Sequence, residues 1–86
     1  MTQKRAKVLT TEWLIKCKDM LDVEYWSFEE EDDAKEWFEK ACRYALDRDD
    51  EETDAYGRTI EQMWRDGEAD FGDMGMTVTT TQRFGY

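Results

Sequence analysis

The stretch Ser27–Asp47 reads SFEEEDDAKEWFEKACRYALD and is the clearest helical segment of this chain. Ser27 and Glu30 have the S-x-x-E spacing of a capping box, which marks a helix start. The apolar residues recur at the spacing of one buried helical face, and they are Ala34, Trp37, Phe38, Ala41, Cys42, Ala45 and Leu46. The pattern predicts an amphipathic helix over Glu29–Asp47 whose apolar face covers the rest of the fold.

Two β-strands are predicted before this helix. From Val8 to Lys18 apolar and polar residues alternate, and the inward set is Leu9, Thr11, Trp13, Ile15 and Cys17. A helix that begins at Thr11 is the alternative interpretation of the same residues. Asp19–Asp22 is predicted to be a turn. Val23–Phe28 is β-branched and aromatic, as is typical of a strand.

The residues after the organising helix predict a second helix and a third strand. Asp54 can cap a shorter helix on which Tyr56, Ile60, Met63 and Trp64 share a face, and Gly67 can end it. A strand over Arg58–Trp64 is the alternative. Glu68–Gly75 is rich in turn residues, and Met76–Phe84 alternates again and favours a strand.

The length of 86 residues indicates one small domain over residues 1–86, with a loose basic arm at residues 1–7. The predicted fold class is α+β. A three-stranded antiparallel sheet packs on the helix Glu29–Asp47, with a shorter second helix beside it. The expected core consists of Trp13, Ile15, Trp26, Phe28, Trp37, Phe38, Ala41 and Cys42.

The charge is strongly acidic and unevenly distributed. The formal net charge is −10, from 22 acids and 12 bases. Residues 1–18 carry +4, from five bases and one acid, whereas residues 19–54 carry −12, from sixteen acids and four bases. Because phosphates would be repelled, direct binding of nucleic acid by the body of the protein is not expected. A partner protein with a basic surface would instead be attracted, and its encounter accelerated.

Neither an enzyme nor a metal protein is indicated by the residue types. The chain has no histidine, so Cys17 and Cys42 lack the partner of a cysteine nucleophile and do not form a zinc site. The acidic loops fail the spacing of a calcium-binding EF-hand loop. We therefore predict a non-enzymatic protein without cofactor or metal. No leader sequence and no apolar run of about 20 residues is present, which favours a cytoplasmic protein with reduced thiols and no membrane contact.

Two acidic clusters flank the predicted helix. Glu29–Asp33 (EEEDD) lies in the first turn, where the helix dipole stabilises carboxylates, so folding alone explains it. Asp47–Asp54 (DRDDEETD) lies at the other end, where the dipole disfavours acids; partner contact and simple solubility remain two explanations for it. The candidate partner-binding residues are Asp47, Asp49, Asp50, Glu51, Glu52, Asp54, Glu29, Glu30 and Asp33.

In size, acidity and the runs EEEDD and DRDDEETD, the chain resembles small phage-encoded inhibitors of host defence, including anti-CRISPR proteins and nucleic-acid mimics. The resemblance implies an inhibitor that acts in the host cytoplasm and blocks a cationic, nucleic-acid-binding surface of a partner. It departs from a pure mimic because Lys35, Lys40 and Arg43 interrupt the acidic helix. Two alternatives are an adaptor domain that joins an assembly through an aromatic face, and a homodimer that associates through Trp13, Val23 and Tyr25 or through Phe84–Tyr86.

Overall fold

The computed structural model describes residues 7–85, with side chains described from Thr10 to Gln82. The elements in chain order are β1 (Lys7–Lys18), β2 (Val23–Phe28), α1 (Glu31–Arg48), α2 (Ile60–Asp66), β3 (Glu68–Asp70) and β4 (Gly75–Gly85). The predicted α+β class is confirmed, but the sheet has four strands and not three. The predicted arm at residues 1–7 lies outside the described residues except for Lys7, which belongs to β1.

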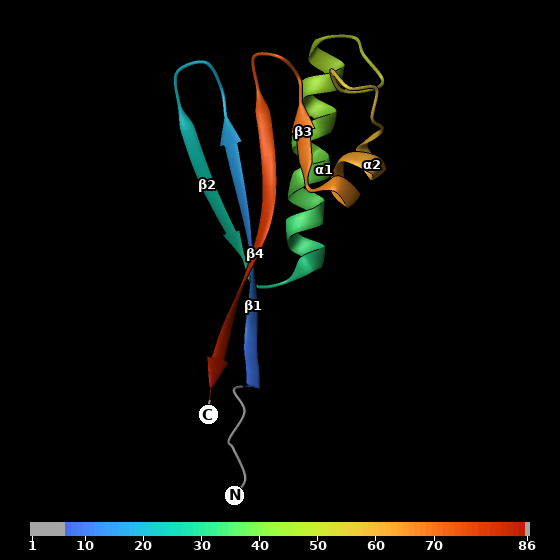
Figure 1. Ribbon diagram of the computed structural model, residues 1–86. Helices are drawn as coiled ribbons and strands as arrows, with labels where there is room; N and C mark the ends of the chain where they lie inside the picture. The colour runs from blue at the N-terminus through green and yellow to red at the C-terminus, as the bar shows by residue number, and fades with distance from the viewer. Residues whose placement is uncertain (1–6, 86) are drawn as a thin grey trace, which may run out of the picture.

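The sheet is antiparallel throughout and has the strand order β2-β1-β4-β3 (Figure 1). β1 and β2 form a hairpin around Asp19–Asp22, as predicted. β4, the last strand of the chain, pairs along β1 in the middle of the sheet. Residues 7–12 of β1 pair only with β4, so a two-stranded ribbon extends beyond the rest of the fold.

The strand that was not predicted is β3, whose residues were expected to form part of a turn. Its three residues read EAD and have little strand propensity of their own. They become extended because they pair with β4, where Ala69 lies opposite Met76. Pairing to a neighbouring strand therefore overrides local propensity in this segment.

The sheet is covered on one face only. Trp13, Ile15 and Cys17 of β1 contribute to the core beneath α1, which confirms the predicted strand over the alternative helix. Lys16 and Lys18 alternate with these residues and therefore belong to the opposite face. Figure 1 looks onto that open face, and α1 lies behind the sheet.

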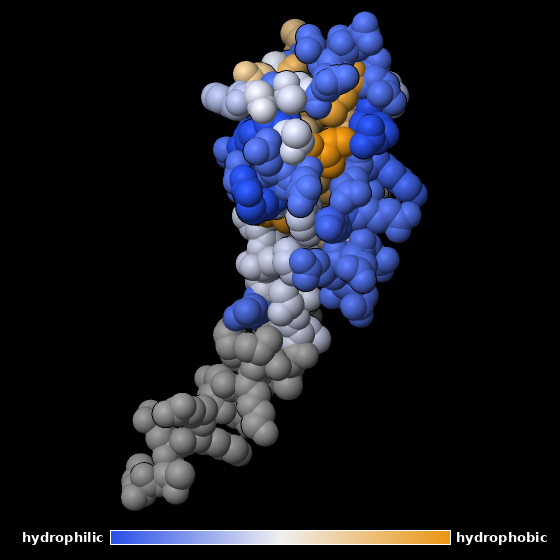
Figure 2. All heavy atoms as spheres, turned by 90° about the vertical axis from the view of Figure 1, so that its right-hand side faces the viewer, coloured by the Kyte–Doolittle hydropathy of each residue, from blue (hydrophilic) through white to orange (hydrophobic). Residues whose placement is uncertain are grey.

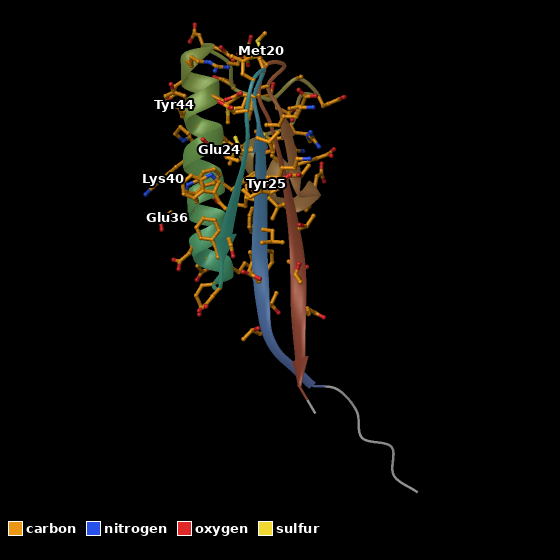
Figure 3. All side chains as sticks on the ribbon, turned by 90° about the vertical axis from the view of Figure 1, so that its left-hand side faces the viewer. Met20, Glu24, Tyr25, Glu36, Lys40 and Tyr44 are labelled. Atoms are coloured by element: carbon orange, nitrogen blue, oxygen red, sulfur yellow. The ribbon has the colours of Figure 1, made fainter. Side chains whose placement is uncertain are left out.

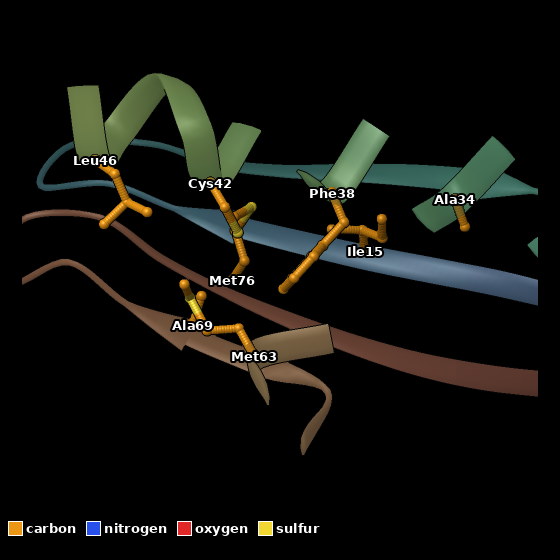
Figure 4. Close-up of a cluster of buried hydrophobic side chains, with 8 residues drawn as sticks. All are labelled: Ile15, Ala34, Phe38, Cys42, Leu46, Met63, Ala69 and Met76. Atoms are coloured by element: carbon orange, nitrogen blue, oxygen red, sulfur yellow. The ribbon is translucent and has the colours of Figure 1, made fainter. Parts of the chain in front are cut away.

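The core lies between α1, α2 and the covered face of the sheet (Figure 4). The buried cluster consists of Ile15, Ala34, Phe38, Cys42, Leu46, Met63, Ala69 and Met76. The α1 members recur every four residues and therefore share one helical face, as the sequence predicts. Trp13, Phe28, Trp37 and Ala41 are half-buried against this cluster.

One predicted core residue, Trp26, is 42% exposed. β2 is an edge strand, so a side chain on its inner face has neighbours on one side only. The Trp26 ring packs against the half-buried Trp37, with ring centroids 5.1 Å apart. The prediction that Trp26 belongs to the core was therefore wrong. Its burial depends on whether β2 is a central or an edge strand, which the local pattern does not reveal.

The predicted capping box at Ser27 and Glu30 is also wrong. Ser27 belongs to β2, and its hydroxyl donates to the Glu12 carboxylate. α1 begins at Glu31, after the N-cap Glu30, whose side chain makes no capping hydrogen bond.

A capping box is present at the second helix instead. The Gln62 N–H donates to the Thr59 hydroxyl at 3.3 Å, and the Thr59 N–H donates to the Gln62 side chain at 2.9 Å. α2 is therefore a helix, not the alternative strand, and Thr59 caps it in place of the predicted Asp54. It ends as predicted at Gly67, whose φ of 73° lies in the left-handed region.

Candidate functional site

The candidate acidic residues gather at the two ends of α1. We call Glu29, Glu30 and Asp33 the N-terminal cluster, and Asp47, Asp50, Glu51 and Glu52 the C-terminal cluster. All seven are exposed. α1 has 18 residues and spans about 27 Å at 1.5 Å per residue, so this rigid element separates the clusters.

The two lysines of α1 pair with glutamates in the middle of the helix. The Lys40 ammonium lies 2.9 Å from the Glu36 carboxylate, and Lys35 lies 3.9 Å from Glu39. Among the described side chains, from Thr10 to Gln82, no ion pair involves a member of either cluster. The carboxylates at both ends are therefore available to a partner.

Asp50 holds an unfavourable backbone conformation at the C-terminal end of α1. The Glu51 N–H donates to the Leu46 carbonyl at 2.9 Å, and the Asp50 N–H donates to the Asp47 carbonyl at 3.3 Å. These two bonds form a Schellman motif, in which glycine usually occupies the left-handed position. That position is held here by Asp50, with φ of 54°. The loop thus places a charged residue where conformation and helix dipole both oppose it.

We expect Asp50→Gly to raise the free energy of unfolding by about 0.5–1 kcal/mol, because glycine adopts positive φ without steric cost. Urea unfolding at neutral pH measures the change. Asp50→Ala is the matched control, because it removes the charge and retains the strain, and it should be less stable than the glycine variant. A glycine variant less stable than wild type would contradict the assigned motif.

Asp49 differs from the C-terminal cluster because it is paired. Its carboxylate accepts two hydrogen bonds from Arg48, at 3.0 and 3.1 Å, and this bonding lowers the pKa of Asp49. Arg48 also donates to Asp73 at 2.9 Å, which ties the end of α1 to the β3–β4 turn. Asp49 is thus partly neutralised within the fold.

Asp54 is not a surface residue, so its place among the predicted partner-binding residues is corrected. It is 6% exposed and accepts four hydrogen bonds. The N–H groups of Tyr56 and Arg58 donate to Oδ1 at 3.0 and 2.9 Å, while the Asp70 N–H and the Arg58 Nε donate to Oδ2 at 3.2 and 2.9 Å. Asp54 therefore anchors the loop to β3.

Arg58 completes this buried anchor. Its guanidinium is held by Asp54, donates to Glu68 at 2.9 Å and lies over the Tyr56 ring at 5.2 Å. Burial alone would raise the pKa of Asp54. The hydrogen bonds from Arg58, Asp70 and Tyr56 outweigh it, so the pKa is lowered and the carboxylate stays charged at neutral pH. The anchor fixes the loop that carries the C-terminal cluster.

The two cysteines are free thiols. Cys42 is buried, and burial, with smaller contributions from Asp54 and Glu39, raises the pKa of its thiol to about 12. Burial likewise raises the pKa of Cys17, with smaller contributions from Glu24 and Asp19. Both thiols thus remain protonated at neutral pH and pack as small core residues.

The surface hollows do not indicate a single ligand. The larger, of about 510 Å³, is lined by Lys16, Lys18, Arg58, Asp19, Glu68, Asp70 and Asp73 among others. Three cations and four acids are mixed there, and Arg58 is already bound. Figure 2 shows a largely hydrophilic face on which hydrophobic residues appear as a strip near its upper middle, with smaller hydrophobic spots elsewhere. No group of three or more metal-ligating side chains occurs in the part of the chain whose side chains are described.

One exposed feature was not predicted from the sequence. Met20 and Leu21, at the tip of the β1–β2 hairpin, are 82% and 92% exposed. The signal was present as two adjacent apolar residues inside the turn DMLD, where polar residues are usual. They lie just before the edge strand β2 in the chain.

Within the described residues, neither helix is long and apolar enough to cross a lipid bilayer. No family model, no curated protein and no solved structure matches this chain.

Proposed function

We propose that this protein is a non-enzymatic acidic binding protein that inhibits a nucleic-acid-binding partner by covering its cationic surface. The supporting observation is the pair of exposed carboxylate clusters at the two ends of α1, which no lysine or arginine neutralises within the described side chains. The clusters take the place of phosphates on the partner and exclude its nucleic acid.

Electrostatics supports a two-point contact. The middle of α1 is close to neutral because Lys35 and Lys40 pair with glutamates of the same helix. The negative potential is therefore concentrated about 27 Å apart, at the helix ends. This arrangement accounts for basic residues in an acidic helix, which a continuous mimic of a phosphate backbone would not contain.

The C-terminal cluster is the stronger of the two candidates. The helix dipole already favours Glu29, Glu30 and Asp33, so those residues also serve the fold. Asp50 instead occupies a strained position beside a negative helix end. Binding explains why acids are kept where local folding disfavours them.

We place the protein in the class of phage-encoded inhibitors of host defence, such as anti-CRISPR and anti-restriction proteins, acting in the host cytoplasm. It needs no cofactor and does not itself bind nucleic acid. A second candidate function is an adaptor domain, which the exposed aromatic residues Tyr25 and Tyr44 favour.

The test compares two variants of equal charge. Glu51→Gln with Glu52→Gln removes two carboxylates from the C-terminal cluster and changes the net charge from −10 to −8. Asp22→Asn with Glu61→Gln makes the same change away from both clusters. A nucleic-acid-binding protein captured from host lysate by the wild type should associate several-fold more slowly with the first variant, and its salt dependence should flatten.

Surface plasmon resonance over a range of ionic strengths measures both effects, and added duplex should compete with the wild type for the captured protein. The control variant should associate nearly as fast as wild type. If both variants associate at the same rate, the C-terminal cluster contributes to solubility and not to binding. Capture of a complex that resists salt and nucleic acid would support the adaptor function instead.

A further inference from the structure

The edge strand β2 is only weakly protected, by the single charged residue Glu24. Its six residues, VEYWSF, pair with β1 on one side only, in a register without a bulge. It contains neither proline nor lysine, the residues that usually prevent an edge from pairing with another strand. Its free row of backbone groups is therefore competent to extend the sheet.

The free backbone groups of β2 can be assigned. The Asp19 N–H donates to the Asp22 carbonyl at 2.9 Å and closes the hairpin. Hydrogen-bonded and non-hydrogen-bonded pairs alternate from there along an antiparallel ladder. The N–H and C=O groups of Val23, Tyr25 and Ser27 consequently point away from β1.

Large apolar side chains surround this edge. The exposed set is Met20, Leu21, Val23, Tyr25 and Trp26 from the hairpin and Tyr44 from α1. Because one aromatic side chain alone presents about 150–250 Å², the set exposes several hundred Å². This approaches the roughly 800 Å² per partner of a standard protein interface. This area is large enough for a specific contact and is larger than scattered single apolar residues would expose.

The charges beside the edge are self-complementary. Figure 3 shows Glu24 and Tyr25 on β2, with Glu36, Lys40 and Tyr44 on the neighbouring flank of α1. If two β2 strands pair antiparallel with Tyr25 opposite Tyr25, Glu24 lies opposite Trp26 of the second copy. Trp26 packs on Trp37, and Lys40 lies one turn further along α1. Glu24 of each copy then approaches the Lys40–Glu36 ion pair of the other, where it can share the Lys40 ammonium.

We propose that two copies of this chain associate through β2 into a two-fold symmetric dimer with a continuous eight-stranded sheet. Tyr25 pairs with Tyr25, and Val23 with Ser27, so that all outward backbone groups of the edge are bonded. Both α1 helices then lie on the same face of the joined sheet, which doubles the number of acidic clusters presented. The inference does not depend on the function proposed above.

Sedimentation velocity and light scattering from micromolar to millimolar concentration test the dimer. Wild type should reach twice the monomer mass of 10.3 kDa, more readily at higher salt because screening reduces the repulsion between two chains of charge −10. Tyr25→Pro removes one outward N–H and spares the bonds to β1, a position where edge strands tolerate proline. It should raise the dimer dissociation constant at least tenfold with an unchanged circular dichroism spectrum.

Two further variants keep the test decisive. If Tyr25→Pro does not fold, Tyr25→Lys places a charge at the two-fold axis and should abolish the dimer. Glu24→Lys should weaken the dimer several-fold, and adding Lys40→Glu should restore it. A wild type that stays monomeric throughout, leaving the edge to a strand of another protein, would overturn the proposal. So would a dimer insensitive to folded Tyr25 variants.

Discussion

Phe38→Ala should lower the free energy of unfolding by about 3–5 kcal/mol, the usual cost of a large cavity in a core. Phe38 is fully buried at the centre of the cluster that joins α1 to the sheet, and its ring centroid lies 5.4 Å from that of Trp64. A loss of this size is a large fraction of the 5–15 kcal/mol typical of a domain. Urea unfolding followed by tryptophan fluorescence measures it.

The control for Phe38 is its neighbour in sequence. Trp37 is a larger residue on the same helix, but it is half-buried and leans on the exposed Trp26. Trp37→Ala should therefore cost clearly less than Phe38→Ala, about 1–2 kcal/mol. The periodicity of the sequence alone treats the two residues as equals. A reversed order of the two losses would mean that α1 is rotated about its axis.

Asp54→Ala should be the second strongly destabilising change, at about 3–5 kcal/mol. It removes the acceptor of three backbone N–H groups and leaves the half-buried Arg58 guanidinium with Glu68 and Asp66 as its remaining ion partners. Asp49→Ala is the matched control, because its ion pair with Arg48 is solvent-exposed and should contribute little to stability. Similar losses in both variants would show that Asp54 is not a structural anchor.

The pH dependence of stability offers an independent check on Asp54. Its folded-state pKa is lowered, so its stabilising contribution is full above the unfolded pKa of about 3.9 and is lost as the pH falls through the folded value. The free energy of unfolding of the wild type should therefore decrease as the pH is lowered from about 5. Asp54→Asn should start less stable at neutral pH and lose less over the same acid range. A parallel loss in the two proteins would assign the acid sensitivity to other carboxylates.

The fold could be predicted wherever the apolar residues of a single segment form a helical or alternating pattern. The three- and four-residue spacing on α1 identifies Phe38, Cys42 and Leu46 as core residues, and alternation on β1 identifies Ile15. Gly67 marks the end of α2 by its conformation alone. β3 and the exposure of Trp26 were not predictable, because both depend on which strands lie side by side.

For the candidate site, the sequence by itself determined that acids gather at both ends of one amphipathic helix, since helix length and acid positions are local properties. Only the tertiary structure decided which of those acids remain free. Asp49 meets Arg48, whose second partner, Asp73, lies 25 residues away, and Asp54 meets the N–H of Asp70. The burial of Asp54 and the second contact of Arg48 depend on residues 16 and 25 positions away, and local spacing carries no information about such neighbours.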